Sequence, residues 1–181
     1  MLAGFAAPEN GRGRAHREPT MDGIVDRFVT YTSTGIGEIA IRLGVAAVLT
    51  MIVGWERERR DKPAGLRTHM LVGVGAAAFY IVAFEILSRG FTADGLRVDP
   101  IRVVEGLIGG IGFLGAGAII QGRGDVRGLT TAAGIWVAGA IGLACGAGFY
   151  AIAAMVAAFV FAILRIVGWF EYRLVKREGR E

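Results

Sequence analysis

The sequence contains a run of 37 residues, from Gly128 to Leu164, without a charged side chain. As one α-helix this run would be about 56 Å long, nearly twice the ~30 Å hydrocarbon core of a bilayer. The run must therefore fold back, and Gly146-Ala147-Gly148 is the natural place for the turn. It predicts two membrane-spanning helices joined at these glycines.

Three further uncharged runs begin at Leu43, Met70 and Gly106. Backbone groups in lipid must be satisfied within each segment, so helices are expected, and no alternation with a period of two suggests a β-barrel. The predicted fold class is all-α, a polytopic membrane protein with a bundle of five transmembrane helices. Extending each run to about 20 residues places these helices over residues 36–55, 68–88, 101–120, 129–146 and 149–168.

Composition agrees with a membrane protein and excludes several other classes. The chain is 54% hydrophobic and has 29 glycines among 181 residues. One Cys and two His exclude a disulfide framework and an ordinary zinc site, and we expect no metal and no cofactor. The net charge of +4 is spread between apolar blocks rather than along one face, so we expect no nucleic-acid partner. No nucleophile–base pair is visible, which argues against an enzyme.

The distribution of Lys and Arg predicts the topology. Twelve of them fall in the first loop, the third loop and the C-terminal end, which an odd number of crossings places on one side. The positive-inside rule then puts the C-terminus in the cytoplasm and the N-terminus outside. Trp55 and Trp169 fall at the cytoplasmic ends of the first and fifth helices, where an aromatic belt is expected.

Three regions are expected along the chain. Residues 1–34 are predicted to be a polar, disordered N-terminal tail, residues 35–171 the five-helix membrane domain, and residues 172–181 a short basic cytoplasmic tail. Translation from Met21 instead of Met1 stays open, because four arginines outside the membrane make a poor exported segment.

Charges at membrane depth are costly unless they are paired or hydrated. We expect such charges in the outward third of the bundle, and four of them, on the first and third helices, to lie within hydrogen-bonding reach of one another. Two interpretations are open: interhelical ion pairs that hold the bundle together, or a polar vestibule whose carboxylates meet a cation or a proton. The outward polar cluster comprises Glu38, Arg42, Glu85, Asp99, Arg102 and Glu105, and the expected compensating group is Glu38, Arg42, Arg102 and Glu105.

A second group of polar residues is predicted on the cytoplasmic face. Pro63 and Gly65 favour a turn, Thr68 can cap the second helix, and the amides that open the fourth helix favour an anion. Arg67, Arg123 and Arg127 could supply countercharges there; the alternative is a solvated rim facing lipid headgroups. This cytoplasmic-face motif comprises Glu56, Arg57, Glu58, Lys62, Arg67, His69, Thr130 and Thr131.

Glycines mark the expected helix contacts. The segment Gly110–Gly115 matches the dinucleotide pattern G-x-G-x-x-G, but no strand precedes it and no acidic residue lies about twenty positions on. The better interpretation is close packing of helix backbones, either within the monomer or in a dimer. The candidate helix-packing residues are Gly106, Gly110, Gly117, Gly142 and Gly146.

Five motifs in order closely resemble the MgtC/SapB family of bacterial inner-membrane proteins, over about residues 36–150. They are Gly54-Trp55-Glu56-Arg57-Glu58, Lys62 to His69, Asp99-Pro100, Gly110 to Gly117 and Gly128 to Ala133. Glu105 departs from the pattern, since many members have Gln there. The resemblance covers the membrane domain only, because better-known members carry a C-terminal ACT-like domain that does not follow here.

The resemblance implies a multi-pass inner-membrane protein with a role in adaptation to low magnesium and in the virulence of pathogenic members. It also implies inhibition of the F-type ATP synthase in some members. We therefore expect a regulator of other membrane proteins, with the bilayer, a membrane-protein partner such as this synthase and a homo-oligomer as interactions. The alternative is a small ion or solute transporter that uses the outward acidic cluster.

Overall fold

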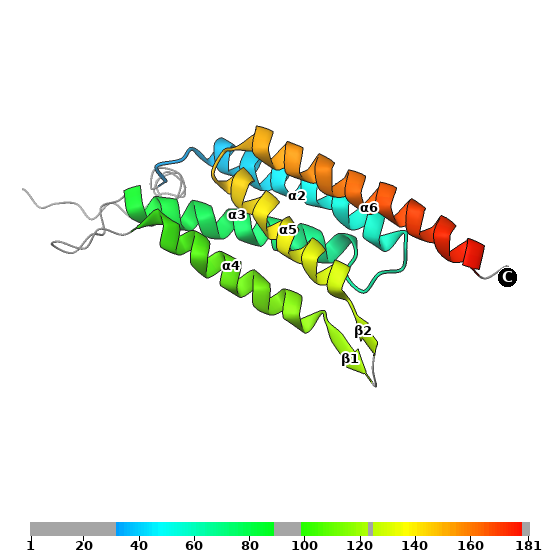
Figure 1. Cartoon of the computed structure of the whole chain (residues 1–181). Helices are drawn as coiled ribbons and strands as arrows, with labels where there is room; N and C mark the ends of the chain where they lie inside the picture. The colour runs from blue at the N-terminus through cyan, green and yellow to red at the C-terminus, as the bar shows by residue number, and fades with distance from the viewer. Residues whose placement is uncertain (1–31, 89–98, 123–124, 179–181) are drawn as a thin grey trace, which may run out of the picture. The chain divides into compact units, whose positions relative to one another are not determined.

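The computed structural model describes residues 32–88, 99–122 and 125–178, and Figure 1 shows their arrangement. These residues form five helices and one short antiparallel hairpin, so the predicted helical fold class is confirmed. The elements are α2 (Ile36–Glu58), α3 (Leu66–Ser88), α4 (Pro100–Gly117), β1 (Ile120–Gly122), β2 (Asp125–Arg127), α5 (Leu129–Gly146) and α6 (Tyr150–Glu178).

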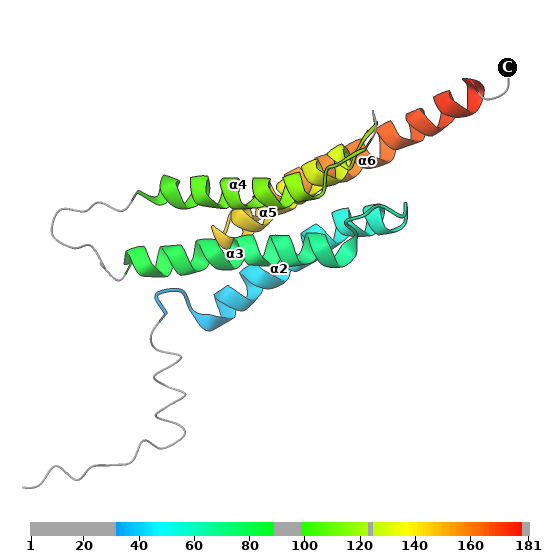
Figure 2. The ribbon, with the colours of Figure 1, turned by 90° about the horizontal axis from the view of Figure 1, so that it is seen from below.

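Four of the helices are long and apolar enough to cross a membrane: α2, α3, α5 and the part of α6 from Tyr150 to Phe170. Successive helices run in opposite directions, as Figures 1 and 2 show. The α2–α3 turn, the hairpin, the start of α5 and the end of α6 therefore lie at the same end of the bundle. We call this the basic end, because Arg57, Arg60, Lys62 and Arg127 lie there, and the other the opposite end.

Helix α5 is the centre of the bundle and contacts the other four helices (Figure 1). Of its 18 residues 56% are buried, against 11–28% of the span window in α2, α3 and α6. Its glycines explain this position. A Cβ on Gly142 would lie 2.8 Å from the Cα of Gly73, and one on Gly146 would lie 2.7 Å from the carbonyl oxygen of Ala77. The predicted packing role of Gly142 and Gly146 is confirmed, and their contact is with α3.

The element bounds agree closely with the sequence prediction for α5 and differ elsewhere. The predicted turn is present, since α5 ends at Gly146 and Gly148 has a positive φ of 83°. The third predicted helix, α4, ends at Gly117 rather than residue 120, because β1 and β2 pair as a hairpin that we did not predict. Helix α6 continues to Glu178, through most of the expected basic tail, while the N-terminal tail before Thr32 lies outside the described residues.

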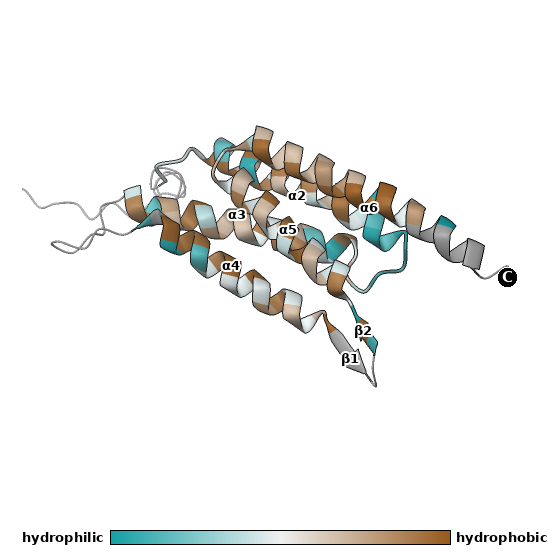
Figure 3. Ribbon diagram, in the orientation of Figure 1, coloured by the Kyte–Doolittle hydropathy of each residue, from teal (hydrophilic) through white to brown (hydrophobic). Residues whose placement is uncertain are grey.

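Polar groups gather at the two ends of the bundle, as the hydropathy colouring in Figure 3 shows. Among the described residues, buried polar side chains at the opposite end are Thr34 and Glu85. Those at the basic end are Glu56, Arg57, His69 and Thr131, and Thr50 lies between the two groups.

Candidate functional site

At the basic end, a hydrogen bond between two buried polar residues, Arg57 of α2 and Thr131 of α5, joins the two helices. The last turns of α2 bury Glu56 and Arg57, which are 4% and 5% exposed. The Nη2 of Arg57 donates to the Oγ1 of Thr131 over 3.2 Å. Glu56 forms an ion pair with Arg60 one turn later on the same segment. The sequence grouped Glu56, Arg57 and Thr131, and the structure places them at one end of the bundle, although the sequence did not identify Arg60.

The turn between α2 and α3 is closed by Glu58. Its Oε2 accepts a hydrogen bond from the backbone N–H of Leu66 over 2.7 Å, which satisfies an amide at the start of α3. The expected cap, Thr68, lies inside the helix, so that prediction was wrong. Gly65 leaves room for this contact, because a Cβ there would overlap the Glu58 carboxylate and displace it.

His69 is fully buried between α2, α3 and α5. Its Nδ1 is 2.8 Å from the carbonyl oxygen of Gly65, and its Nε2 has no hydrogen-bond partner in the described part of the chain. Gly134 makes room for the ring, because a Cβ there would lie 3.0 Å from Nε2 of His69. A Cβ on Gly54 would lie 2.8 Å from the Cα of Leu66 and 3.1 Å from the Cβ of His69, so this glycine lets α2 approach the start of α3. His69 is therefore a packed side chain between three helices. Within the described ranges no three His, Cys, Asp or Glu side chains are placed to hold a metal ion.

A cavity of about 770 Å³ opens at the basic end, between the α2–α3 turn, the hairpin, the start of α5 and α6. Two residues lining it, Arg60 and Asp61, were not among our sequence candidates. Arg67, an expected countercharge, is not part of the lining, and Arg123 lies outside the described residues. The predicted residues that line the cavity are Arg57, Lys62, Arg127, Thr130 and Thr131.

At the opposite end, two charged residues of α2 form an ion pair with each other, and each also bonds to the region where α5 ends and α6 begins. The Nε of Arg42 donates to the Oε1 of Glu38 over 2.9 Å, and its Nη1 donates to the carbonyl oxygen of Gly146 over 2.7 Å. Tyr150 donates its hydroxyl to the same Glu38 oxygen over 3.0 Å. The predicted i, i+4 pair is confirmed, whereas Tyr150 was not predicted because nothing in the sequence pairs it with Glu38.

Glu85, near the end of α3, is hydrogen-bonded to the segment before α2. It is 8% exposed, and its two carboxylate oxygens accept from the backbone N–H groups of Ser33 and Thr34 over 2.7 and 2.8 Å. Charge-assisted bonds of this kind stabilise a carboxylate near the start of a helix. The contacts of Glu85 are thus those of a structural residue.

The α4 members of the outward polar cluster do not join this network. Asp99 caps α4 by accepting from the N–H of Ile101 over 2.9 Å. Arg102 and Glu105 are exposed, and neither forms an ion pair or a side-chain hydrogen bond among the residues that the structure describes. The expectation that these two compensate Glu38 and Arg42 was wrong, because α4 packs on α3 and α5 instead of α2.

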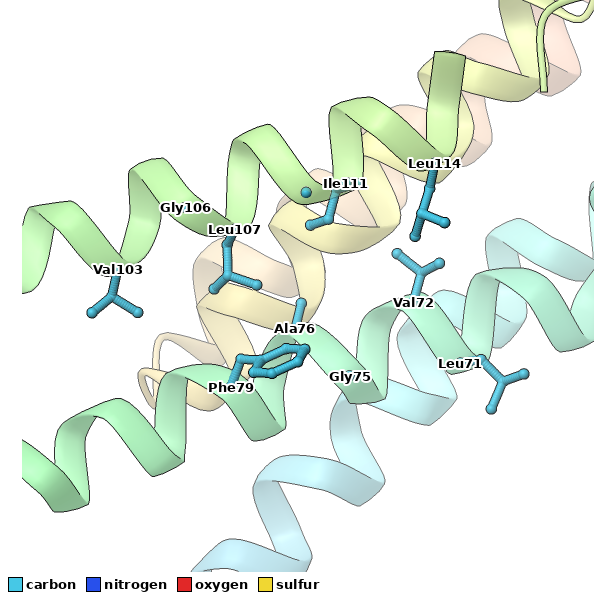
Figure 4. Close-up of a pocket in the computed structure, with 11 residues that line it drawn as sticks. Leu71, Val72, Gly75, Ala76, Phe79, Val103, Gly106, Leu107, Ile111 and Leu114 are labelled. Atoms are coloured by element: carbon cyan, nitrogen blue, oxygen red, sulfur yellow. The ribbon is translucent and has the colours of Figure 1, made fainter. Parts of the chain in front are cut away.

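Between α3 and α4 lies an apolar groove of about 650 Å³, which Figure 4 shows in close-up. Val72 of α3 points toward Leu114 of α4, and Leu71, Phe79 and Leu107 also line the groove. The lining that the described residues provide has no charged or hydroxyl-bearing side chain. The groove also includes Gly106 and Gly110.

The glycines of α4 are not used for packing within the chain. A Cβ on Gly106, Gly110 or Gly117 would meet nothing within 4 Å, so the interpretation of close packing within the monomer was wrong for these three. On this helix Gly115 is the exception, since a Cβ there would lie 3.4 Å from the carbonyl oxygen of Ala132 on α5. Helix α4 therefore carries an open glycine face beside the groove.

Comparison with known proteins supports the resemblance found in the sequence. The model of the MgtC family matches residues 43–173. The chain is 38% identical over 140 residues to YhiD of Escherichia coli K12, covering 77% of this chain and 65% of YhiD. It is 37% identical over 133 residues to SapB of Bacillus subtilis, covering 73% of this chain and 57% of SapB. It is 42% identical over 128 residues to MgtC of Brucella abortus, covering 71% of this chain and 50% of that protein.

This chain thus spans about half to two thirds of the length of these relatives. No solved structure matches it significantly.

Proposed function

We propose a regulatory function for this chain, which belongs to the MgtC family of multi-pass inner-membrane proteins. In this proposal it acts on another membrane protein during adaptation to low magnesium, and it contacts that partner through the glycine face of α4. The F-type ATP synthase, which the family resemblance suggests, is the first partner to test.

The observation that carries the proposal is a comparison of two glycine pairs in the same chain. Gly142 and Gly146 are four residues apart and bring the backbone of α5 against that of α3. Gly106 and Gly110 have the same spacing on α4, but nothing lies within 4 Å of a Cβ at either position. Small residues at this spacing let two membrane helices approach closely. The second pair is thus suited to a helix from another chain.

The distribution of polar groups favours a regulator over a transporter. Buried polar residues in the described ranges lie at the two ends, and only Thr50 lies between them. The hydroxyl of Thr50 donates to the carbonyl oxygen of Ala46 in its own helix over 2.7 Å. Ions that cross a membrane need polar groups along their path. The name of the E. coli relative, "Putative magnesium transporter YhiD", keeps transport as the alternative to test.

We further propose that α4 is a fifth span and that the basic end faces the cytoplasm. Helix α4 has 18 residues and runs beside α3 and α5 from one end of the bundle to the other (Figure 2). Five crossings with the basic end inside follow the positive-inside rule and place the N-terminus outside. Reporter fusions after Gly124 and Glu181 should read cytoplasmic, and a fusion after Gly95 should read external; the inverse pattern would contradict this topology.

Gly110→Leu tests the regulatory proposal, with Gly112→Leu as a matched control. Both glycines lie on α4, and a Cβ at either position meets open space, but only Gly110 borders the groove. We expect both variants to accumulate in the membrane like the unmodified chain. Affinity purification in mild detergent should then recover the partner with Gly112→Leu and lose it with Gly110→Leu.

Recovery of the partner with both variants would contradict a role for this face. Magnesium uptake by vesicles containing only the purified chain would favour the transporter instead. The two results are independent, so one set of purified proteins separates the two functions.

A further inference from the structure

The start of α5 leaves backbone donors available in the cavity at the basic end. Gly128 occupies the N-cap position with a φ of 91°, and it has no side chain with which to cap the helix. The first amide that finds a helical acceptor is that of Ala132, which donates to the carbonyl oxygen of Gly128 over 2.8 Å. The amides of Leu129, Thr130 and Thr131 therefore lack a helical acceptor at a cavity wall to which all three residues contribute.

A buried arginine lines the same cavity. Arg57 is 5% exposed, and its Nε has no hydrogen-bond partner among the residues that the structure describes. Its guanidinium donates to Thr131 but forms no ion pair in the described part of the chain. The neighbouring carboxylate, that of Glu56, is paired with Arg60, so an anion in this cavity would give the buried guanidinium of Arg57 a countercharge in contact with it.

The remaining charges of the wall also favour an anion. Arg60 and Arg127 line the cavity but are each paired with a carboxylate, that of Glu56 or Asp125. Lys62 lines the cavity and forms no ion pair among the described residues, while Asp61 contributes the one negative charge of the described wall.

The other wall of the cavity is apolar. It is formed by Val126 of the hairpin and by Ile163, Leu164 and Val167 of α6. A ligand with a phosphate group and an apolar portion would match both walls. Basic pockets between membrane helices and uncapped helix starts are both suited to phosphate groups.

We propose that this cavity is a binding site for a phosphate group, held by the open amides of α5 and the guanidinium of Arg57, with Lys62 at the rim. The phosphate can belong to an anionic phospholipid or to a soluble phosphate compound. The site is separate from the groove between α3 and α4, so it stands whether or not the regulatory proposal holds.

The test measures binding to the purified full chain in detergent. The probes are a short-chain phosphatidylglycerol and inorganic phosphate, with short-chain phosphatidylcholine as the zwitterionic control, and the readout is native mass spectrometry with thermal stabilisation. Lys62→Gln should weaken binding about tenfold, the loss expected for one charge-assisted contact. Arg59→Gln is the matched control, because it also removes one exposed positive charge near this turn but does not line the cavity.

Saturable binding of phosphatidylglycerol alone would assign the phosphate to a lipid, and binding of inorganic phosphate would assign it to a soluble compound. Either result supports the site if Lys62→Gln weakens binding and Arg59→Gln binds as the unmodified chain does. The proposal is overturned if neither probe binds saturably, if phosphatidylcholine binds as tightly, or if the two variants bind equally, whether both are weakened or neither is.

Discussion

Gly142→Ala should destabilise the bundle by forcing α3 and α5 apart. The new Cβ would overlap the carbonyl oxygen of Gly73 and lie 2.7 Å from its carbonyl carbon and 2.8 Å from its Cα. All three are backbone atoms of α3, so no side chain can move aside, and the two helices must separate. Overpacking of this kind costs about 1–3 kcal/mol.

The loss of stability in Gly142→Ala is compared with that in a matched variant, Gly110→Ala. There the added Cβ meets nothing within 4 Å, so only the helix propensity of Ala remains, which is better than that of Gly by up to about 1 kcal/mol. Gly142→Ala has the same propensity gain, so the overpacking cost leaves an expected net loss of about 1 kcal/mol. For a chain of this size that loss corresponds to a decrease of about 2–4 °C in the unfolding midpoint.

Thermal unfolding in detergent, followed by tryptophan fluorescence, measures both variants under identical conditions. We expect a lower midpoint for Gly142→Ala and an unchanged or slightly higher one for Gly110→Ala. Equal midpoints would refute the reasoning, because they would mean that the backbones of α3 and α5 do not touch at Gly142. A lower midpoint for Gly110→Ala alone would mean that α4 makes the tighter contact.

Three further predictions concern hydrogen bonds and use the same unfolding assay. Glu85→Gln should cost about 1–2 kcal/mol, because an amide accepts the two backbone bonds less well than a carboxylate, whereas Glu105→Gln should stay within about 0.5 kcal/mol because that residue is exposed. Tyr150→Phe should lower the midpoint by a few degrees through loss of the bond to Glu38, and an unchanged midpoint would refute a role for that bond. Thr50→Val should cost about 0.6 kcal/mol or less, since it loses only a bond within α2, and a larger loss would indicate a partner on another helix.

The fold was predictable from the sequence to the extent that it depends on local patterns. An uncharged run too long for one helix predicted the turn at Gly146–Gly148, and the charges that flank the runs placed Arg57 and Thr131 at the same end of the bundle. The hairpin over residues 120–127 was missed because three-residue strands have too little pattern to distinguish them from a loop.

The candidate sites depended on which helices become neighbours, and the sequence does not contain that information locally. Glu38 and Arg42 are four residues apart on one helix, so their pairing could be predicted. Their grouping with Arg102 and Glu105 required α2 to lie beside α4, and the structure places α5 and α6 beside Arg42 instead.

The two glycine pairs also show that a sequence pattern does not identify which helices become neighbours, and the proposed function depends on these pairs. Gly106-x-x-x-Gly110 and Gly142-x-x-x-Gly146 are equivalent as patterns, and both are typical of close helix contacts. Only the second is in close contact with a helix of its own chain, because α5 is central, whereas the first borders the groove between α4 and α3 and has nothing within 4 Å of an added Cβ. A glycine in a helix lowers its stability relative to alanine, so an open pair has a cost that packing within this chain does not offset. A helix packed against α4 from outside the chain would offset that cost, and this is why we place the partner there.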